Sequence, residues 1–270
     1  MPVRQVGEHQ VWRLRTPRQA LLTWLGWLLG LIVVAVCFRF VSGQTMWVFV
    51  WDAGAQAADL ASRMVPPEWS YARRLWVPLW DTVNIATFGT LIALVVSVPV
   101  AFLAARNTTP HPVFRQAALV IIVFSRSVNS LIWALLLVSV LGPGLLAGII
   151  AIALRSIGFV SKLLFEAIEE INPRPIEALA ATGAQGGQVL GYGVVPQIMP
   201  AFAGISVYRW DINIRESTVL GLVGAGGIGL QLDASIGELQ WARASVIFVM
   251  ILVLVVFSEW VSARVRQSIK

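Results

Sequence analysis

Runs of about twenty apolar residues recur along this 270-residue chain, separated by shorter polar segments. A bilayer core about 30 Å thick needs roughly 20 residues of helix to cross it. By this criterion the chain has six spans, of which the third to fifth are interrupted by polar residues. The predicted spans are Ala20–Val41, Thr82–Ala105, Arg115–Leu141, Gly144–Phe165, Val189–Ile212 and Ala244–Ala263. We therefore predict an all-α, polytopic helical membrane protein.

The spans divide the chain into four unequal parts. Residues 1–19 form a polar N-terminal segment, and residues 20–41 form a first anchor helix. We expect this anchor to be retained, because it has no clear small-residue cleavage site. Residues 42–77 form a long connection with several tryptophans, suited to an interfacial belt or a helix lying on the membrane. Residues 78–270 hold the other five spans, which we expect to form one packed core.

Composition agrees with this pattern, and charge orients it. The chain is 57% hydrophobic and 13% charged, well below the quarter typical of soluble domains. Its net charge of +6 does not indicate nucleic acid, because the basic residues flank the apolar runs. These residues are Arg4, Arg13, Arg15, Arg18, Arg106, Arg115, Lys162, Arg174, Arg264, Arg266 and Lys270. With six spans they share one side, and the positive-inside rule places that side, with both termini, in the cytoplasm.

Sequence motifs exclude several kinds of chemistry. Residues 224–229 fit GxGxxG, but that fingerprint needs a strand before it and a helix after it. Between two spans it indicates close backbone packing instead. The chain has no GxxxxGK[ST] phosphate loop, no metal-ligand spacing and a single Cys37. We therefore expect no cofactor, no metal site and no catalytic residues.

Ionisable residues inside the spans are the candidate functional side chains. A charge at the bilayer centre is costly and usually faces a cavity or a partner. Because arginines outnumber acids and guanidinium groups suit oxyanions, a path for a small anion is one hypothesis. The other is structural pairing, for example of Arg209 or Arg126 with Asp211. The candidate path residues are Arg126, Asn129, Arg155, Arg209, Asp211 and Arg215.

A polar island of small residues, Glu177–Pro200, follows the fourth span on the predicted cytoplasmic side and overlaps the start of the fifth. Its Ala and Leu residues favour a short helix, which glycines and prolines limit at both ends. The island resembles the EAA loop of ABC-importer permeases: EAA, three residues, Gly, nine residues, then I-x-L-P. Glu177, Ala178, Gly183 and Pro196 match, whereas Leu179 replaces the second Ala. Gly193 and Val195 replace the Ile and Leu of the ending.

A second resemblance lies downstream. The segment Tyr208–Leu232, YRWDINIRESTVLGLVGAGGIGLQL, is similar to permease subunits of phosphonate ABC importers. Together with Ile132–Leu136 and Arg174–Gly183 the resemblance covers about half of the chain, mainly residues 125–235. The AGGIG part is shared with methionine-importer permeases and so indicates the class more than the substrate.

The resemblance implies a type I ABC importer permease in a bacterial cytoplasmic membrane. Two copies would surround a path for phosphonates, phosphate or phosphite, with two ATP-binding cassette subunits on the cytoplasmic face and an extracytoplasmic binding protein outside. The loop at 172–196 would hold the coupling helix, with Glu177, Ala178, Ala181 and Gly183 at the ATPase. Membrane lipid is the remaining partner. The alternatives are a related importer for a solute such as methionine, a stand-alone anion channel or carrier, and an intramembrane enzyme.

Overall fold

The computed structural model describes residues 3–6, 9–12 and 17–268, and it divides into two compact units. The first unit runs from Met1 to Leu60 and the second from Ala61 to Lys270. The predicted flanking residues Arg13, Arg15 and Lys270 lie outside the described residues.

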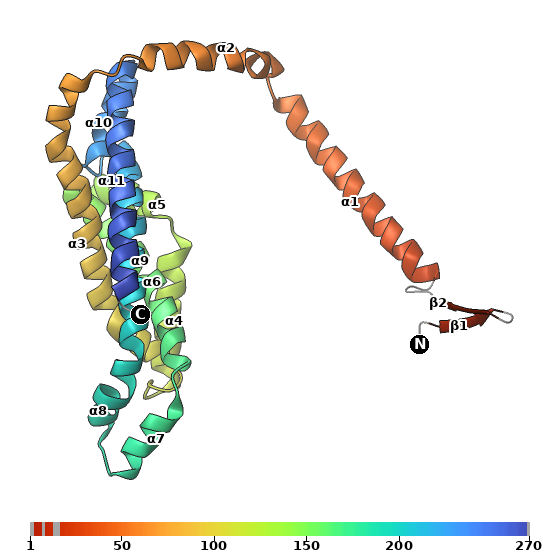
Figure 1. Ribbon diagram of the computed structural model, residues 1–270, viewed down its shortest axis with the longest axis vertical. Coiled ribbons are helices and arrows are strands. Elements are labelled where there is room, and N and C mark those ends of the chain that lie inside the picture. Colours follow the sequence, from red (N-terminus) through yellow and green to blue (C-terminus); the bar gives the residue numbers. More distant parts are fainter. Residues whose placement is uncertain (1–2, 7–8, 13–16, 269–270) are drawn as a thin grey trace. The chain divides into compact units, whose positions relative to one another are not determined.

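The first unit holds a two-stranded hairpin and the anchor helix (Figure 1). Strands β1 (Val3–Val6) and β2 (His9–Trp12) pair antiparallel. Helix α1 (Pro17–Gln44) contains the predicted anchor and is apolar on all sides, with no buried residue in its most hydropathic window. A helix of this kind suits a lipid environment. Half of the predicted connection is one helix, α2 (Trp47–Met64), which crosses into the second unit.

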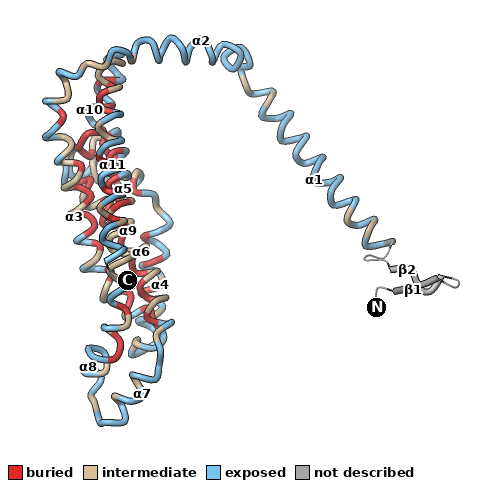
Figure 2. Tube along the Cα trace, in the orientation of Figure 1, coloured by how far each residue is buried: buried red, intermediate tan, exposed pale blue. Residues whose placement is uncertain are grey.

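The second unit is a helical core arranged around α6 (Leu145–Glu169), which packs on α3, α4, α5 and α9. After the short η1 (Trp69–Tyr71), α3 (Ala72–Ala104) runs along α6. Small residues let the backbones approach: a Cβ on Gly158 would lie 2.7 Å from the carbonyl oxygen of Ile122. Buried residues follow this inner seam in Figure 2, while the outer faces of the helices remain exposed.

The predicted third span is broken into two helices. Helix α4 (Pro112–Ser127) and α5 (Ser130–Leu141) meet at an angle of 88°. The break has a local cause, because Val128 and Asn129 adopt extended backbone and the Asn129 side chain accepts a hydrogen bond from the Leu131 N–H. The core therefore has a bent pair where the sequence suggested one span.

The predicted fifth span ends too early. Helix α9 runs from Val195 to Leu220, after α8 (Gly186–Val189) and one π-helical turn, η2 (Leu190–Val194). Arg209 thus lies near the middle of α9, whereas the predicted bounds Val189–Ile212 put it three residues from the end of the span. The hydropathy of the segment falls at its charged residues, but these side chains find partners inside the core and the helix continues.

The GxGxxG segment makes the predicted close backbone packing. Between η3 (Gly221–Val223) and α10 (Ile228–Gly237), Gly224, Gly226 and Gly227 adopt positive φ of 85°, 83° and 77°. A Cβ on Gly229 would lie 2.0 Å from the carbonyl oxygen of Thr218, so only glycine fits. The turn leads into α10, and α11 (Trp241–Ser268) completes the core. In Figure 1, α10 and α7 lie at opposite ends of the core.

Candidate functional site

The polar island folds as a projecting loop, residues 172–194, which we call the α7 knob. Helix α7 (Pro173–Ala181) begins after Asn172, whose side chain accepts a hydrogen bond from the Arg174 N–H at 3.1 Å. Proline at the first helical position suits this start, because its missing N–H would have no helical partner there. The helix ends at Ala181, and Gly183 follows with a φ of +84°, a left-handed conformation that glycine adopts without strain.

On the inner face of the knob, two residues that differ from the EAA pattern, Leu179 and Gly193, lie next to each other. Leu179 and Ile176 are the residues that a side chain at Gly193 would meet. A Cβ on Gly193 would lie 3.1 Å from Leu179 Cδ1, which is a tight contact. The larger side chain at position 179 therefore occupies space that an isoleucine at position 193 would otherwise fill.

Gln197 closes the base of the knob. Its Nε2 donates to the carbonyl oxygens of Gly193 at 2.6 Å and Asn172 at 3.3 Å. Its Oε1 accepts from the Asn172 N–H at 3.1 Å. One side chain on α9 thus joins the first residue of the knob to one of its last.

The outer face of the knob is free for a partner. No residue of α7 is buried. Glu177, Ala178, Ala181 and Gly183, the predicted coupling residues, are all exposed. A Cβ on Gly183 would meet nothing within 4 Å. The surface combines small side chains with one carboxylate, so another protein could approach its backbone closely.

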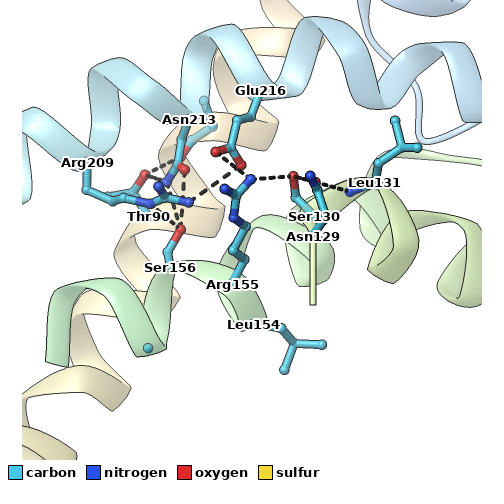
Figure 3. A network of polar contacts seen from close by, with 12 residues as sticks. Thr90, Asn129, Ser130, Leu131, Leu154, Arg155, Ser156, Arg209, Asn213 and Glu216 are labelled. Atoms are coloured by element: carbon cyan, nitrogen blue, oxygen red, sulfur yellow. Dashed lines mark hydrogen bonds and ion pairs between the residues drawn. The ribbon is translucent and has the colours of Figure 1, made fainter. Parts of the chain in front are cut away.

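A polar network lies in the middle of the core, where α3, α6 and α9 meet (Figure 3). Arg155 Nη1 donates to Glu216 Oε1 at 2.9 Å and to Ser130 Oγ at 3.2 Å. Arg209 Nε donates to Ser156 Oγ at 2.9 Å. Asn213 Nδ2 donates to Ser156 Oγ at 3.1 Å and to Thr90 Oγ1 at 2.7 Å. The network thus joins two arginines and one carboxylate with four neutral side chains, which come from α3, α5, α6 and α9.

The two arginines of this network differ in freedom. The Arg209 side chain is 3% exposed, and its guanidinium lies over the Phe159 ring at 5.1 Å. Its Nη2 lies 3.5 Å from Glu216 Oε2, and neither atom makes a hydrogen bond within the described residues. The Arg155 side chain is 33% exposed. Arg209 is therefore held in place, whereas Arg155 reaches the surface of this single chain.

A charged stripe continues from Arg155 along α6 toward the knob. Arg155, Lys162 and Glu166 are spaced at i, i+7 and i+11, which puts them on one face over about 16 Å of helix. Lys162 pairs with Glu166. Beside Lys162, Arg126 lines a pocket of about 330 Å³ between α4 and α6, and within the described part of the chain Arg126 has no acidic partner. Such residues rarely face lipid.

The structure distributes the six predicted path residues over three places. Arg155 and Arg209 meet in the network, and Asn129 caps α5 beside it. Asp211 instead pairs with Arg215 and accepts a hydrogen bond from Ser258 of α11 at 2.8 Å. Arg126 lies in the pocket next to Lys162. Neither Arg209 nor Arg126 pairs with Asp211, so the example of pairing suggested from the sequence is wrong. Asp211 pairs with Arg215 instead.

The sequence prediction did not select four members of the polar network, Glu216, Asn213, Ser156 and Thr90. The spacing of Arg209, Asn213 and Glu216 at i, i+4 and i+7 marks one polar face of α9 and could have indicated the first two. Ser156 and Thr90 carry no comparable signal. Among the described residues, no group of three or more His, Cys, Asp or Glu side chains could hold a metal ion.

Solved structures identify the fold. The MetNI methionine ABC transporter, in an inward-facing conformation, matches with a TM-score of 0.63 at 22% identity, covering 73% of this chain and 96% of that chain. A bacterial ABC transporter for alginate matches with a TM-score of 0.54 at 18% identity, covering 90% and 98%. The fold is that of ABC importer permeases, as the sequence predicted.

Sequence comparison identifies the family to which the chain belongs. Residues 97–270 match the family described as binding-protein-dependent transport system inner membrane component, and the chain belongs to this family. It is 41% identical to the phosphite transport system permease protein PtxC of Stutzerimonas stutzeri over 253 residues, 91% of this chain and 92% of PtxC. It is also 41% identical to the phosphate-import permease protein PhnE of Mycolicibacterium smegmatis over 216 residues, 80% of this chain and 41% of PhnE.

Proposed function

We propose that this chain is the transmembrane permease subunit of an ATP-driven importer for phosphonates, phosphite or phosphate. The observation that carries the proposal is the excess of guanidinium over carboxylate at the centre of an apolar core, where Arg155 and Arg209 share Glu216. Guanidinium groups bind tetrahedral oxyanions through paired, charge-assisted hydrogen bonds. The relatives named for phosphite and phosphate import support the same class of solute.

The path follows the charged stripe of α6 in this proposal. A water-filled path would account for Arg155 and Lys162 on an otherwise apolar exterior, because such side chains usually face a cavity or a partner. A second copy of the chain would cover this face and complete the path. Arg126 would lie beside it, and the contribution of Asn129, Asp211 and Arg215 stays a prediction.

The α7 knob would dock the ATPase. Its exposed Glu177, Ala178, Ala181 and Gly183 form a small protruding surface without bulky side chains, which suits insertion into a cleft. Closure of the ATPase dimer on ATP would move the knob and with it the helices that follow. The complete importer would contain two copies of this chain, two ATP-binding cassette subunits and an extracytoplasmic binding protein.

In the proposed membrane orientation, the knob and both termini lie in the cytoplasm. Arg106 lies 3.9 Å from Glu169 at the end of α6, and Arg115 donates to the Ala104 carbonyl oxygen at 3.2 Å. Arg174 lies in the knob itself. These basic residues gather at one end of the core, as the positive-inside rule requires of a cytoplasmic face.

Reconstitution with the ATPase and the binding protein tests the proposal. We expect phosphite or methylphosphonate to stimulate ATP hydrolysis and methionine not to do so. Ala178→Trp should abolish co-purification of the ATPase, because it adds bulk to the exposed face of α7. Ala234→Trp, an equally exposed site on α10 at the other end of the core, is the matched control. Methionine stimulation would indicate the alternative importer, and solute flux without an ATPase would indicate a channel or carrier.

A further inference from the structure

The polar network contains one carboxylate for two guanidinium groups. With ordinary charges, Arg155 and Arg209 carry two positive charges and Glu216 carries one negative charge, which leaves an excess of one positive charge. The nearest other acid on α9, Asp211, is engaged by Arg215 and Ser258. Charges removed from water need compensation, so the network as it stands can accommodate a further anion.

Glu216 is bound unequally by its two partners. Its Oε1 accepts a hydrogen bond from Arg155 at 2.9 Å. Its Oε2 lies 3.5 Å from Arg209 Nη2, and neither of these two atoms has a hydrogen bond within the described residues. A buried donor and a buried acceptor therefore face each other slightly too far apart to bond. A small movement of the Glu216 carboxylate toward Arg209 would satisfy both.

Arg155 is the partner that can change ligands. Arg209 is fixed by Ser156 and by the Phe159 ring. Arg155 is 33% exposed, and within the described residues its guanidinium forms hydrogen bonds and ion pairs only with Glu216 and the Ser130 hydroxyl. A solute approaching from the exposed side would meet Arg155 first, with Glu216 behind it.

We propose that Glu216 is an internal counter-ion that a tetrahedral oxyanion replaces on Arg155 during transport, an inference that rests on the proposed function. The solute takes the hydrogen bonds of Arg155, and Glu216 moves to close the gap to Arg209. When the solute leaves, Glu216 returns to Arg155. The exchange keeps affinity low enough for release, because the solute must displace Glu216 from Arg155 in order to bind.

The charge of Glu216 is what the test removes. Phosphite binding to the purified permease–ATPase complex, without the binding protein, can be followed by ³¹P NMR titration, which detects weak binding. We expect Glu216→Gln to tighten phosphite binding at least tenfold and to slow transport. Glu238→Gln removes the same charge from an exposed residue after α10 and should leave the affinity unchanged.

Two further variants test whether the tighter phosphite binding depends on the exchange at Arg155. Arg155→Gln combined with Glu216→Gln should lose the gain, because no partner is released for the solute. Glu216→Asp keeps the charge but shortens the side chain by one methylene, so we expect a gain of a few-fold. This variant carries the test if the neutral variant fails to assemble.

The outcomes separate the exchange from the proposed function. Unchanged or weaker phosphite binding by Glu216→Gln, or by Glu216→Asp if only that variant assembles, overturns the exchange. A gain that persists in the double variant also overturns it. Wild-type complex that shows no oxyanion-stimulated ATP hydrolysis in the presence of the binding protein contradicts the proposed function itself. Stimulated wild type with an unaltered Glu216→Gln affinity contradicts the exchange alone.

Discussion

On the inner face of the α7 knob, position 179 has a larger side chain than the EAA pattern and position 193 a smaller one. Mutation can restore the residues of the pattern at both positions. The EAA pattern that the loop resembles has Ala at the first position and Ile at the second. Here a Cβ on Gly193 would lie 3.1 Å from Leu179 Cδ1 and 3.4 Å from Ile176 Cγ1. The variants Leu179→Ala, Gly193→Ile and the combination of both test whether the two positions form one packing unit.

The magnitudes follow from the contacts. Leu→Ala at a fully buried site costs about 2–5 kcal/mol, and we expect about 1–2 kcal/mol at Leu179 because it is half-buried. Gly193→Ile adds a side chain where a single Cβ is already tight, so overpacking should cost about 1–3 kcal/mol. In the combination the added isoleucine fills the space that the leucine leaves. We therefore expect the double variant to recover about 2 kcal/mol relative to the sum of the single variants, within the range for residues in contact.

Amide hydrogen exchange of residues 176–181 measures this locally, because it reports the free energy of opening the knob. Since about 1.4 kcal/mol corresponds to a factor of ten, Leu179→Ala should speed exchange about 5–30-fold. Leu190→Ala, at an exposed position of η2, is the control and should change exchange by less than about threefold. If exchange in the double variant equals the product of the two single effects, the positions are independent and do not form one packing unit.

Three further predictions concern the core and the base of the knob. Gly229→Ala would place a Cβ 2.0 Å from the Thr218 carbonyl oxygen and should abolish folded protein in membranes, measured as the yield from size-exclusion chromatography. The control Gly237→Ala, with open space around it, should keep the yield, and equal yields of the two variants would contradict the close packing at Gly229. Gln197→Ala removes three hydrogen bonds at the base of the knob and should raise hydrogen exchange there by about tenfold, with a loss of ATPase coupling; unchanged protection would show that the clamp is dispensable. Ser156→Ala leaves Arg209 Nε without its acceptor and should cost about 1–3 kcal/mol, seen as a lower Tm, whereas the exposed Ser139→Ala should be neutral.

The apolar pattern predicted the helical spans because lipid imposes a length on each of them. It did not predict the break at Asn129, because a bent pair has the same hydropathy as one long span. The apolar pattern also ended the fifth span too early, because charged residues lower the hydropathy of a helix that continues to Leu220. Hydropathy counts the charges of Arg215 and Glu216 against burial, but it does not detect the partners that make their burial possible.

The candidate site shows the same limit. The α7 knob could be located because its polarity and its glycines are local features of the chain. The partners in the network are separated by 53 residues between Arg209 and Ser156 and by 123 residues between Asn213 and Thr90. No local pattern joins them, so the sequence supplied two arginines of the network without the carboxylate they share.

The buried amide of Asn213 has a mechanical consequence. It ties α9 to Thr90 on α3 and to Ser156 on α6 with hydrogen bonds of 2.7 and 3.1 Å. Sliding one of these helices past another by a single turn, about 5.4 Å, would break these bonds between buried side chains. We therefore expect the three helices to turn together as a stiff lever, so that a displacement at the knob arrives at the centre of the bundle undiminished. In the proposed importer, we then expect the more flexible contacts to be those between separate chains.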